Sequence, residues 1–136
     1  MTNPWKTLIL LITMALLSFR PVTAVVIDDT NKQIIAALTA GDAAALSVWF
    51  NTMVDLGIAG NEDTYSKTQA TRIMKDFFIK NPVKSVRVSQ QGSSNDGSQF
   101  VIGEMKAGAD TYRIYYLLKS VSGKFLIHQL QLQKTN

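Results

Sequence analysis

The residue best suited to acid–base chemistry is His128, the single histidine of the chain. An imidazole titrates near neutral pH and can act as a general base when a carboxylate orients it. In the segment 124–134 His128 alternates with leucines, which predicts a place on an apolar strand face. Glu104 or Asp55 would have to supply the carboxylate. No carboxylate lies at a recognisable spacing, so we prefer a neutral, hydrogen-bonded histidine in or beside the core.

Two carboxylates, Glu104 and Asp55, are also candidate functional groups. Glu104 alternates with Phe100 and Ile102 and would be a functional candidate if it were buried with a raised pKa. A solvated glutamate near Lys106 is the simpler interpretation, and we favour it. Asp55 alternates with the apolar residues of its own segment, so we expect it to face solvent or the edge of the sheet.

Aromatic side chains could line a pocket for a planar or amphipathic ligand. Tyr112 and Tyr116 share one face of the segment 111–120 with Ile114 and Leu118. A core face or a dimer face shows the same pattern, and we prefer core packing. We assign no catalytic residue, and our candidate ligand-binding side chains are Trp49, Tyr65, Glu104, Tyr112, Tyr116 and His128.

Several kinds of chemistry lack the residues that they require. The chain has no cysteine, and one histidine cannot form a histidine-based metal site. Glu62 and Asp63 are adjacent and lack the alternate spacing that wraps calcium. No nucleophile elbow or phosphate loop occurs. The net charge of +4 has no run of Lys or Arg behind it, which argues against nucleic acid as a partner. We therefore expect no metal and no cofactor.

The first 24 residues have the composition of a cleavable secretory signal peptide. Lys6 precedes an apolar run from Leu8 to Leu17, and small residues precede a cleavage site after Ala24. The alternative is a short uncleaved membrane anchor, but Arg20 interrupts the run before it can span a bilayer. Without cysteine, no lipid can be attached after the cleavage site. We expect a protein exported to the periplasm or beyond, without a stable membrane anchor.

The remaining residues, 25–136, are enough for one domain. Apolar periodicity predicts a helix over 29–40, with an aspartate cap before it and Gly41 ending it. Asp42 would cap a second helix, which would carry Leu46, Trp49 and Phe50 on one face. Ser66 followed by Gln69 is a capping box for a third helix, which Asn81-Pro82 would end.

The other segments favour strands. Period-two alternation covers 53–58, and 59–64 has the composition of a loop. After Pro82, four segments rich in branched and aromatic residues predict consecutive strands, at 83–91, 99–107, 111–120 and 124–134. This order predicts an α+β fold: three helices packed on a curved antiparallel sheet of about five strands, shaped as a cone.

Several short motifs resemble one superfamily. They are Ala40-Gly41-Asp42-Ala43 with Trp49-Phe50, Tyr65-Ser66-Lys67, Asp76-Phe77-Phe78 with Asn81-Pro82, Ile102-Gly103, and Gly123-Lys124-Phe125-Leu126-Ile127 with Gln129-Leu130. The chain resembles the nuclear-transport-factor-2-like (cystatin-like) superfamily, and within it a family of uncharacterised secreted bacterial proteins. The resemblance implies the cone architecture. It implies no mechanism, because these are packing and turn residues.

Three functions fit this pattern. We prefer an exported, non-catalytic module that binds an unknown small ligand or a protein partner. The second is a small enzyme of the isomerase, dehydratase or hydrolase type using His128 with a carboxylate. The third is a homodimer through the exposed sheet face. A cone interior filled by Trp49, Phe77 and Phe78 would leave no room for a ligand and would direct attention to the sheet face.

Overall fold

The computed structural model of the chain describes residues 28–135, so the predicted signal peptide lies outside the described residues. Helices and strands follow the predicted order with one addition. The elements are α2 (Asp29–Ala40), α3 (Ala43–Ser47), β1 (Phe50–Ile58), β2 (Asn61–Ser66), α4 (Lys67–Lys80), β3 (Val83–Ser93), β4 (Gln99–Ala107), β5 (Asp110–Val121) and β6 (Lys124–Thr135).

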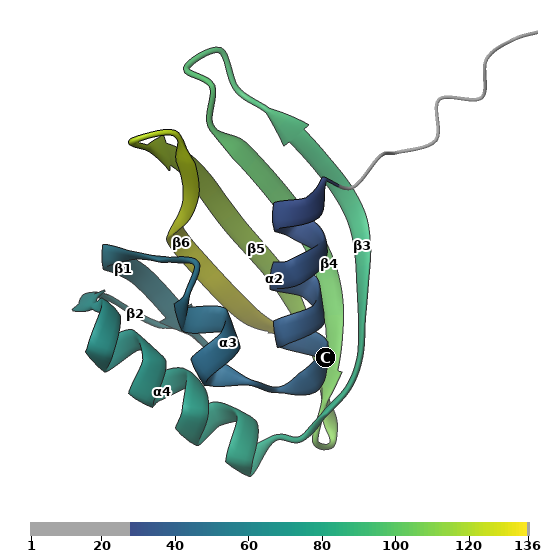
Figure 1. Ribbon diagram of the computed structural model, residues 1–136. Helices are drawn as coiled ribbons and strands as arrows, with labels where there is room; N and C mark the ends of the chain where they lie inside the picture. Colours follow the sequence, from purple (N-terminus) through teal and green to yellow (C-terminus); the bar gives the residue numbers. More distant parts are fainter. Residues whose placement is uncertain (1–27, 136) are drawn as a thin grey trace, which may run out of the picture.

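The six strands form one sheet in the order β2-β1-β6-β5-β4-β3. The three helices lie over one face, here called the inner face, and leave the outer face uncovered (Figure 1). Strands β3 to β6 form the predicted antiparallel meander. The prediction of an all-antiparallel sheet of about five strands was wrong, because β1 pairs with β6 in parallel. The two strands are far apart in the sequence, and no local turn signal reveals their pairing.

The additional strand is β2, in the segment that we expected to be a loop. Ala59 and Gly60 both have positive φ (50° and 90°), which is the geometry of a two-residue hairpin turn. The turn brings Asn61–Ser66 back along β1. The residues of β2 are exposed or half-buried, as suits an edge strand, and their polar composition concealed the strand in the sequence.

The second helix is shorter than expected. It ends at Ser47, Trp49 lies in the following turn, and Phe50 begins β1. The predicted helical stripe of three residues was therefore wrong, although Leu46 and Phe50 are both buried. Five helical residues provide less than two turns, and the strand that follows takes over the burial of the aromatic side chain.

The other helix boundaries are confirmed by their caps. The Asp28 side chain accepts a hydrogen bond from the backbone N–H of Asn31 and begins α2. Gly41 ends that helix in the left-handed conformation, with φ of 61°. Ser66 and Gln69 form the complete capping box of α4.

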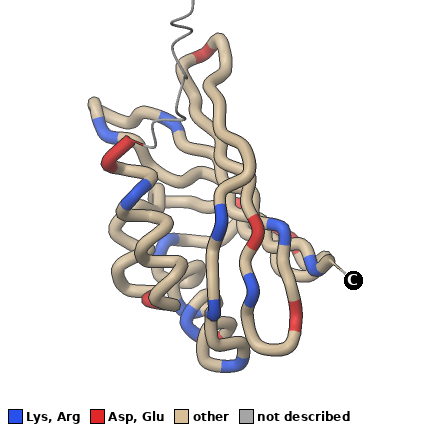
Figure 2. Tube along the Cα trace, turned by 90° about the vertical axis from the view of Figure 1, so that its right-hand side faces the viewer, with Lys and Arg blue, Asp and Glu red and all other residues tan. Residues whose placement is uncertain are grey.

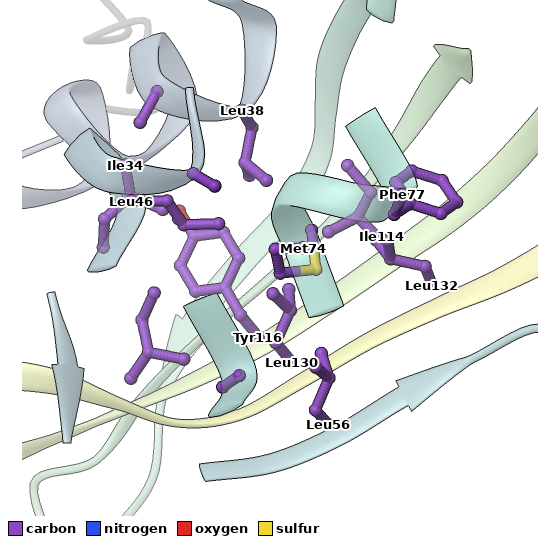
Figure 3. Packing of buried hydrophobic residues seen from close by; sticks show 14 of the residues in the cluster. Ile34, Leu38, Leu46, Leu56, Met74, Phe77, Ile114, Tyr116, Leu130 and Leu132 are labelled. Carbon is purple, nitrogen blue, oxygen red and sulfur yellow. The ribbon is translucent and has the colours of Figure 1, made fainter. Parts of the chain in front are cut away.

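The core lies between the inner face of the sheet and the helices (Figure 3). Met74 of α4 lies beside Tyr116 and Leu130 from the sheet, and Phe77 lies beside Ile114 and Leu132. All six side chains have an exposed fraction of 7% or less. The rings of Phe77 and Tyr112 pack edge to face with centroids 5.2 Å apart. The interior is filled by side chains from every layer.

Candidate functional site

His128 lies at a break in the pairing of β6 with β5. Ile127 pairs with Leu118 and Gln129 pairs with Leu117, so His128 is the extra residue of a β-bulge. The bulge shifts the alternation, and the buried residues of β6 are Ile127, Leu130 and Leu132. The expected placing of His128 in phase with the leucines was therefore wrong.

The partner of His128 is a backbone group. Its Nδ1 lies 3.1 Å from the carbonyl oxygen of Leu126, and this hydrogen bond requires Nδ1 to donate. Among residues 28–135, no carboxylate forms a hydrogen bond or ion pair with the imidazole. The ring is half-buried, and a general base there would lack the group that orients it.

The two candidate carboxylates lie on the outer face. Glu104 is half-buried and pairs in register with Arg87 on one side and Arg113 on the other. Asp55 is exposed, as predicted, and its carboxylate accepts a hydrogen bond of 2.6 Å from the Thr64 hydroxyl. Neither carboxylate forms a hydrogen bond with His128, so the three residues do not make one hydrogen-bonded group.

Tyr112 and Tyr116 point into the core, with exposed fractions of 5% and 1%. The Tyr116 hydroxyl donates a hydrogen bond of 2.9 Å to Oδ1 of Asn31, which is itself buried in α2. Burial raises the pKa of Tyr116, and the nearby charge of Asp28 raises it further. This pair connects helix α2 to the centre of the sheet by a buried hydrogen bond.

Trp49 and Tyr65 line two different open hollows. The hollow at Trp49, of about 420 Å³, lies between α2 and α3 and is lined largely by alanines. The Lys124 ammonium lies 5.1 Å from the centre of the Trp49 ring. The hollow at Tyr65, of about 330 Å³, lies between α4 and the β1–β2 hairpin. The six predicted ligand-binding residues are therefore spread over the core, the outer face and two separate hollows.

The outer face carries a feature that the sequence interpretation missed. Phe100 pairs with Leu117 and Ile102 pairs with Tyr115, so four large apolar side chains lie together on β4 and β5. All four are half-buried, and none belongs to the core cluster or to the residues packed against it. We call Phe100, Ile102, Tyr115 and Leu117 the outer patch. Its sequence signal was the unbroken apolar character of 100–102 and 115–118.

A family model for a domain of unknown function, DUF4783, matches residues 31–133. The chain belongs to the DUF4783 family. A DUF4783 family protein from Bacteroides ovatus has a crystal structure with 34% sequence identity and a TM-score of 0.73. The match covers 76% of this chain and 94% of that one. No curated protein matches the chain.

More distant solved structures extend the likeness of this DUF4783 protein to the wider fold. An NTF2-like protein from Cytophaga hutchinsonii is 15% identical, with a TM-score of 0.60 over 79% of this chain and 93% of that one. A domain with a cystatin-like fold from Nostoc punctiforme is 12% identical, with a TM-score of 0.62 over 77% and 72%. At these identities the likeness is one of fold, and it confirms the predicted cystatin-like, NTF2-like fold.

Two properties of the described part of this DUF4783 chain concern metal ions and membranes. Within residues 28–135, no three histidine or acidic side chains gather where they could hold a metal ion. None of the helices in that range has the length and apolar composition needed to cross a membrane.

Proposed function

We propose that the protein is an exported, non-catalytic interaction module that binds a protein partner through the outer face of its sheet. The observation that carries the proposal is the outer patch, in which four large apolar side chains lie on a face that no helix covers. Contiguous apolar side chains on the surface of a folded domain commonly mark a binding site for another protein. Aromatic residues are enriched at such sites, and the patch contains two.

The filled interior favours a protein partner over an enclosed small ligand. Phe77 and Phe78 are buried, and Tyr116 fills the space between α2 and the sheet. Trp49 lies at the rim rather than inside, so the filling differs in this residue from the expected set. The hollows that remain are open to solvent and lie around the periphery of the domain.

The non-catalytic part of the proposal rests on the hydrogen-bond partners of His128 and Asp55. His128 bonds to a backbone carbonyl, and Asp55 is engaged by Thr64. The alternative of a cone-fold enzyme would require a carboxylate to approach His128 within hydrogen-bond distance. No observation on residues 28–135 favours that alternative.

Export rests on the composition of residues 1–24, outside the described range. Two observations are compatible with cleavage before the domain: the family match begins at residue 31, and the first helix of the described residues is capped by Asp28. Cleavage after Ala24 would leave every described element intact. Mass spectrometry of the protein recovered from the periplasm of its own bacterium tests this: we expect a chain beginning at Val25, and retention of Met1 to Ala24 would contradict it.

Site-specific photo-crosslinking in living cells tests the binding surface. A photoreactive phenylalanine analogue replaces Tyr115 in the outer patch and, as the matched control, Ile79, which is 68% exposed on α4. We expect a discrete crosslinked protein product from position 115 and none from position 79. Absence of a product at 115, or equal products at both positions, would overturn the proposal.

A further inference from the structure

A third open hollow, of about 220 Å³, lies between the start of α2 and the end of the β3–β4 hairpin. Figure 1 shows this end of α2 beside β3. None of the six ligand-binding residues predicted from the sequence lines the hollow. Most of the residues that do line it carry polar side chains: Asp28, Asn31, Gln91, Ser93 and Gln99. The hollow is therefore chemically unlike the two apolar hollows at Trp49 and Tyr65.

Asn31 presents hydrogen-bond donors to this hollow from a buried position. The residue is 4% exposed, and its Oδ1 accepts the hydrogen bond of the Tyr116 hydroxyl. That bond fixes the orientation of the amide, whose Nδ2 donates to no group within residues 28–135. Because Asn31 is otherwise enclosed, an acceptor can reach Nδ2 only through the hollow. Polar groups in such positions are normally satisfied by a bound partner or by water.

Asp28 adds a charged acceptor at the same place. Its Oδ1 accepts a hydrogen bond of 2.9 Å from the backbone N–H of Asn31 and so caps α2. Within residues 28–135 the Asp28 side chain forms no ion pair, and its Oδ2 accepts no hydrogen bond. A carboxylate can accept about four hydrogen bonds, so Asp28 retains acceptor capacity for a ligand. The side chains of Ser93 and Gln99 are equally unengaged in the described part of the chain.

The charges around the hollow argue against an ionic ligand. No lining residue is basic, and between Arg87 and Lys106 the strands carry no Lys or Arg, as can be followed in Figure 2. An anion would therefore meet only the repulsion of Asp28. A cation would pair with Asp28 but leave the donors of Asn31 unmatched. One carboxylate is also too few for calcium, which takes six to eight oxygen ligands.

A neutral ring with several hydroxyl groups matches this lining. Each hydroxyl both donates and accepts, so neighbouring hydroxyls can donate to Asp28 and accept from Asn31. The ring of Phe100 lies across Gly92, where a Cβ atom would come within 2.7 Å of it, and offers an apolar surface to the C–H face of a sugar. The volume lies below the roughly 300 Å³ at which pockets for drug-sized molecules begin, which suits a single ring.

We propose that this hollow binds one sugar ring of the pyranose type, as a free monosaccharide or as the end of a longer glycan. The inference goes beyond the proposed function, because it adds a ligand that is not a protein. Phe100 is the single lining residue that also belongs to the outer patch. The two binding sites can therefore be tested separately.

Two matched aspartate variants test the site. Asp28→Ser removes the carboxylate and keeps a side chain that caps helices equally well. Asp42→Ser makes the same change at the cap of α3, where Asp42 accepts from the backbone N–H of Ala45 at 3.0 Å and does not line the hollow. Gln99→Leu removes an amide from the hollow without changing any cap. Urea denaturation of each variant shows that it is folded.

The probes are the methyl glycosides of glucose, galactose, mannose and N-acetylglucosamine, and oligosaccharides that end in these sugars. Saturation-transfer NMR of the purified protein gives the dissociation constants. We expect at least one probe to bind the wild type. Asp28→Ser should weaken that binding by at least about ten-fold, and Gln99→Leu by about five-fold, because each loses hydrogen bonds to the sugar. Asp42→Ser should bind as the wild type does.

The two groups of probes distinguish the sources of the ligand. Binding of a methyl glycoside supports a free monosaccharide, and binding of oligosaccharides alone supports the end of a glycan. Binding of neither group would overturn the proposal. Equal affinities for Asp28→Ser, Gln99→Leu and Asp42→Ser would also overturn it, because the sugar would then bind elsewhere.

Discussion

The inner and outer faces of the sheet consist of the same strands, but only the inner face is covered by helices. Strand β5 shows this most clearly, because Ile114 and Tyr116 on the inner side are at most 2% exposed, while Tyr115 and Leu117 on the outer side are half-buried. Large apolar side chains therefore occur on both sides, but only the inner ones meet a helix. Apolar character alone does not mark the core; the presence of a covering layer does.

Polar groups on the two faces also have different surroundings. On the inner side, the buried hydroxyl of Tyr116 is matched by the Asn31 side chain. On the outer side, Arg87 and Glu104 are adjacent in register, and water can solvate them. Substitutions on the inner side should therefore change the free energy of unfolding, whereas those on the outer side should change association.

The largest expected effect on stability is that of Phe77→Ala. Phe77 contacts the rings of Phe78 and Tyr112 in the core, and its truncation leaves a cavity. We expect a loss of about 3–5 kcal/mol in the free energy of unfolding, measured by urea denaturation. The control is Leu117→Ala in the outer patch, for which the loss in the monomer should stay below about 1 kcal/mol. Equal losses in the free energy of unfolding for the two variants would contradict the distinction between the faces.

A smaller effect is expected where β3 and β4 approach each other closely. A Cβ atom at Gly103 would lie 2.6 Å from the carbonyl oxygen of Arg87, and backbone has little freedom to move. Gly103→Ala should therefore cost about 1–3 kcal/mol. A Cβ atom at Gly92 would meet only the end of the Phe100 ring, at 2.7 Å, and that ring can turn aside. Gly92→Ala should cost less in the same urea titration; the reverse order would contradict this account.

The buried hydrogen bond between Tyr116 and Asn31 gives a third comparison. Tyr116→Phe removes the hydroxyl and leaves the buried Oδ1 of Asn31 without its donor. The expected loss is about 1–3 kcal/mol. Tyr115→Phe removes a hydroxyl from the outer side and should change stability by less than about 0.5 kcal/mol. A neutral Tyr116→Phe would mean that water replaces the lost donor.

The raised pKa of Tyr116 predicts that the stability of the fold falls at alkaline pH. Because the pKa of Tyr116 is raised in the folded state, its protonated form is favoured there. The stabilisation is fully present below the unfolded pKa of about 10. It is lost as the pH rises further, by at most about 1.4 kcal/mol per pH unit. Urea midpoints from pH 9 to 11 should fall more steeply for the wild type than for Tyr116→Phe. Parallel slopes would show that Tyr116 does not contribute.

Local signals in the sequence predicted much of the fold. Helix α4 is defined by contacts three or four residues apart, so Ser66, Gln69 and the apolar stripe predicted its start and its buried face. The antiparallel meander was predictable because turns of short length connect its strands. The cystatin-like fold was predicted from a resemblance in packing and turn residues.

The parts of the fold that the sequence did not predict depend on pairing between strands. Strand β2 has polar side chains on both faces, and only its pairing with β1 makes it a strand. The parallel contact of β1 with β6 is long-range, as is the bulge that moves His128 out of phase. The outer patch was hidden because apolar residues on both sides of β4 and β5 look like a strand buried on both faces.

The most direct test of the division between the faces combines photo-crosslinking from position 115 with urea denaturation, for Leu117→Arg beside the wild type. Leu117 lies in the outer patch and outside the core cluster, so a charge there should disrupt association without unfolding the domain. We predict that the wild type gives a discrete crosslinked product, and that Leu117→Arg loses this product while its urea midpoint stays unchanged. A variant that keeps the crosslinked product, or that loses stability like Phe77→Ala, would contradict the account.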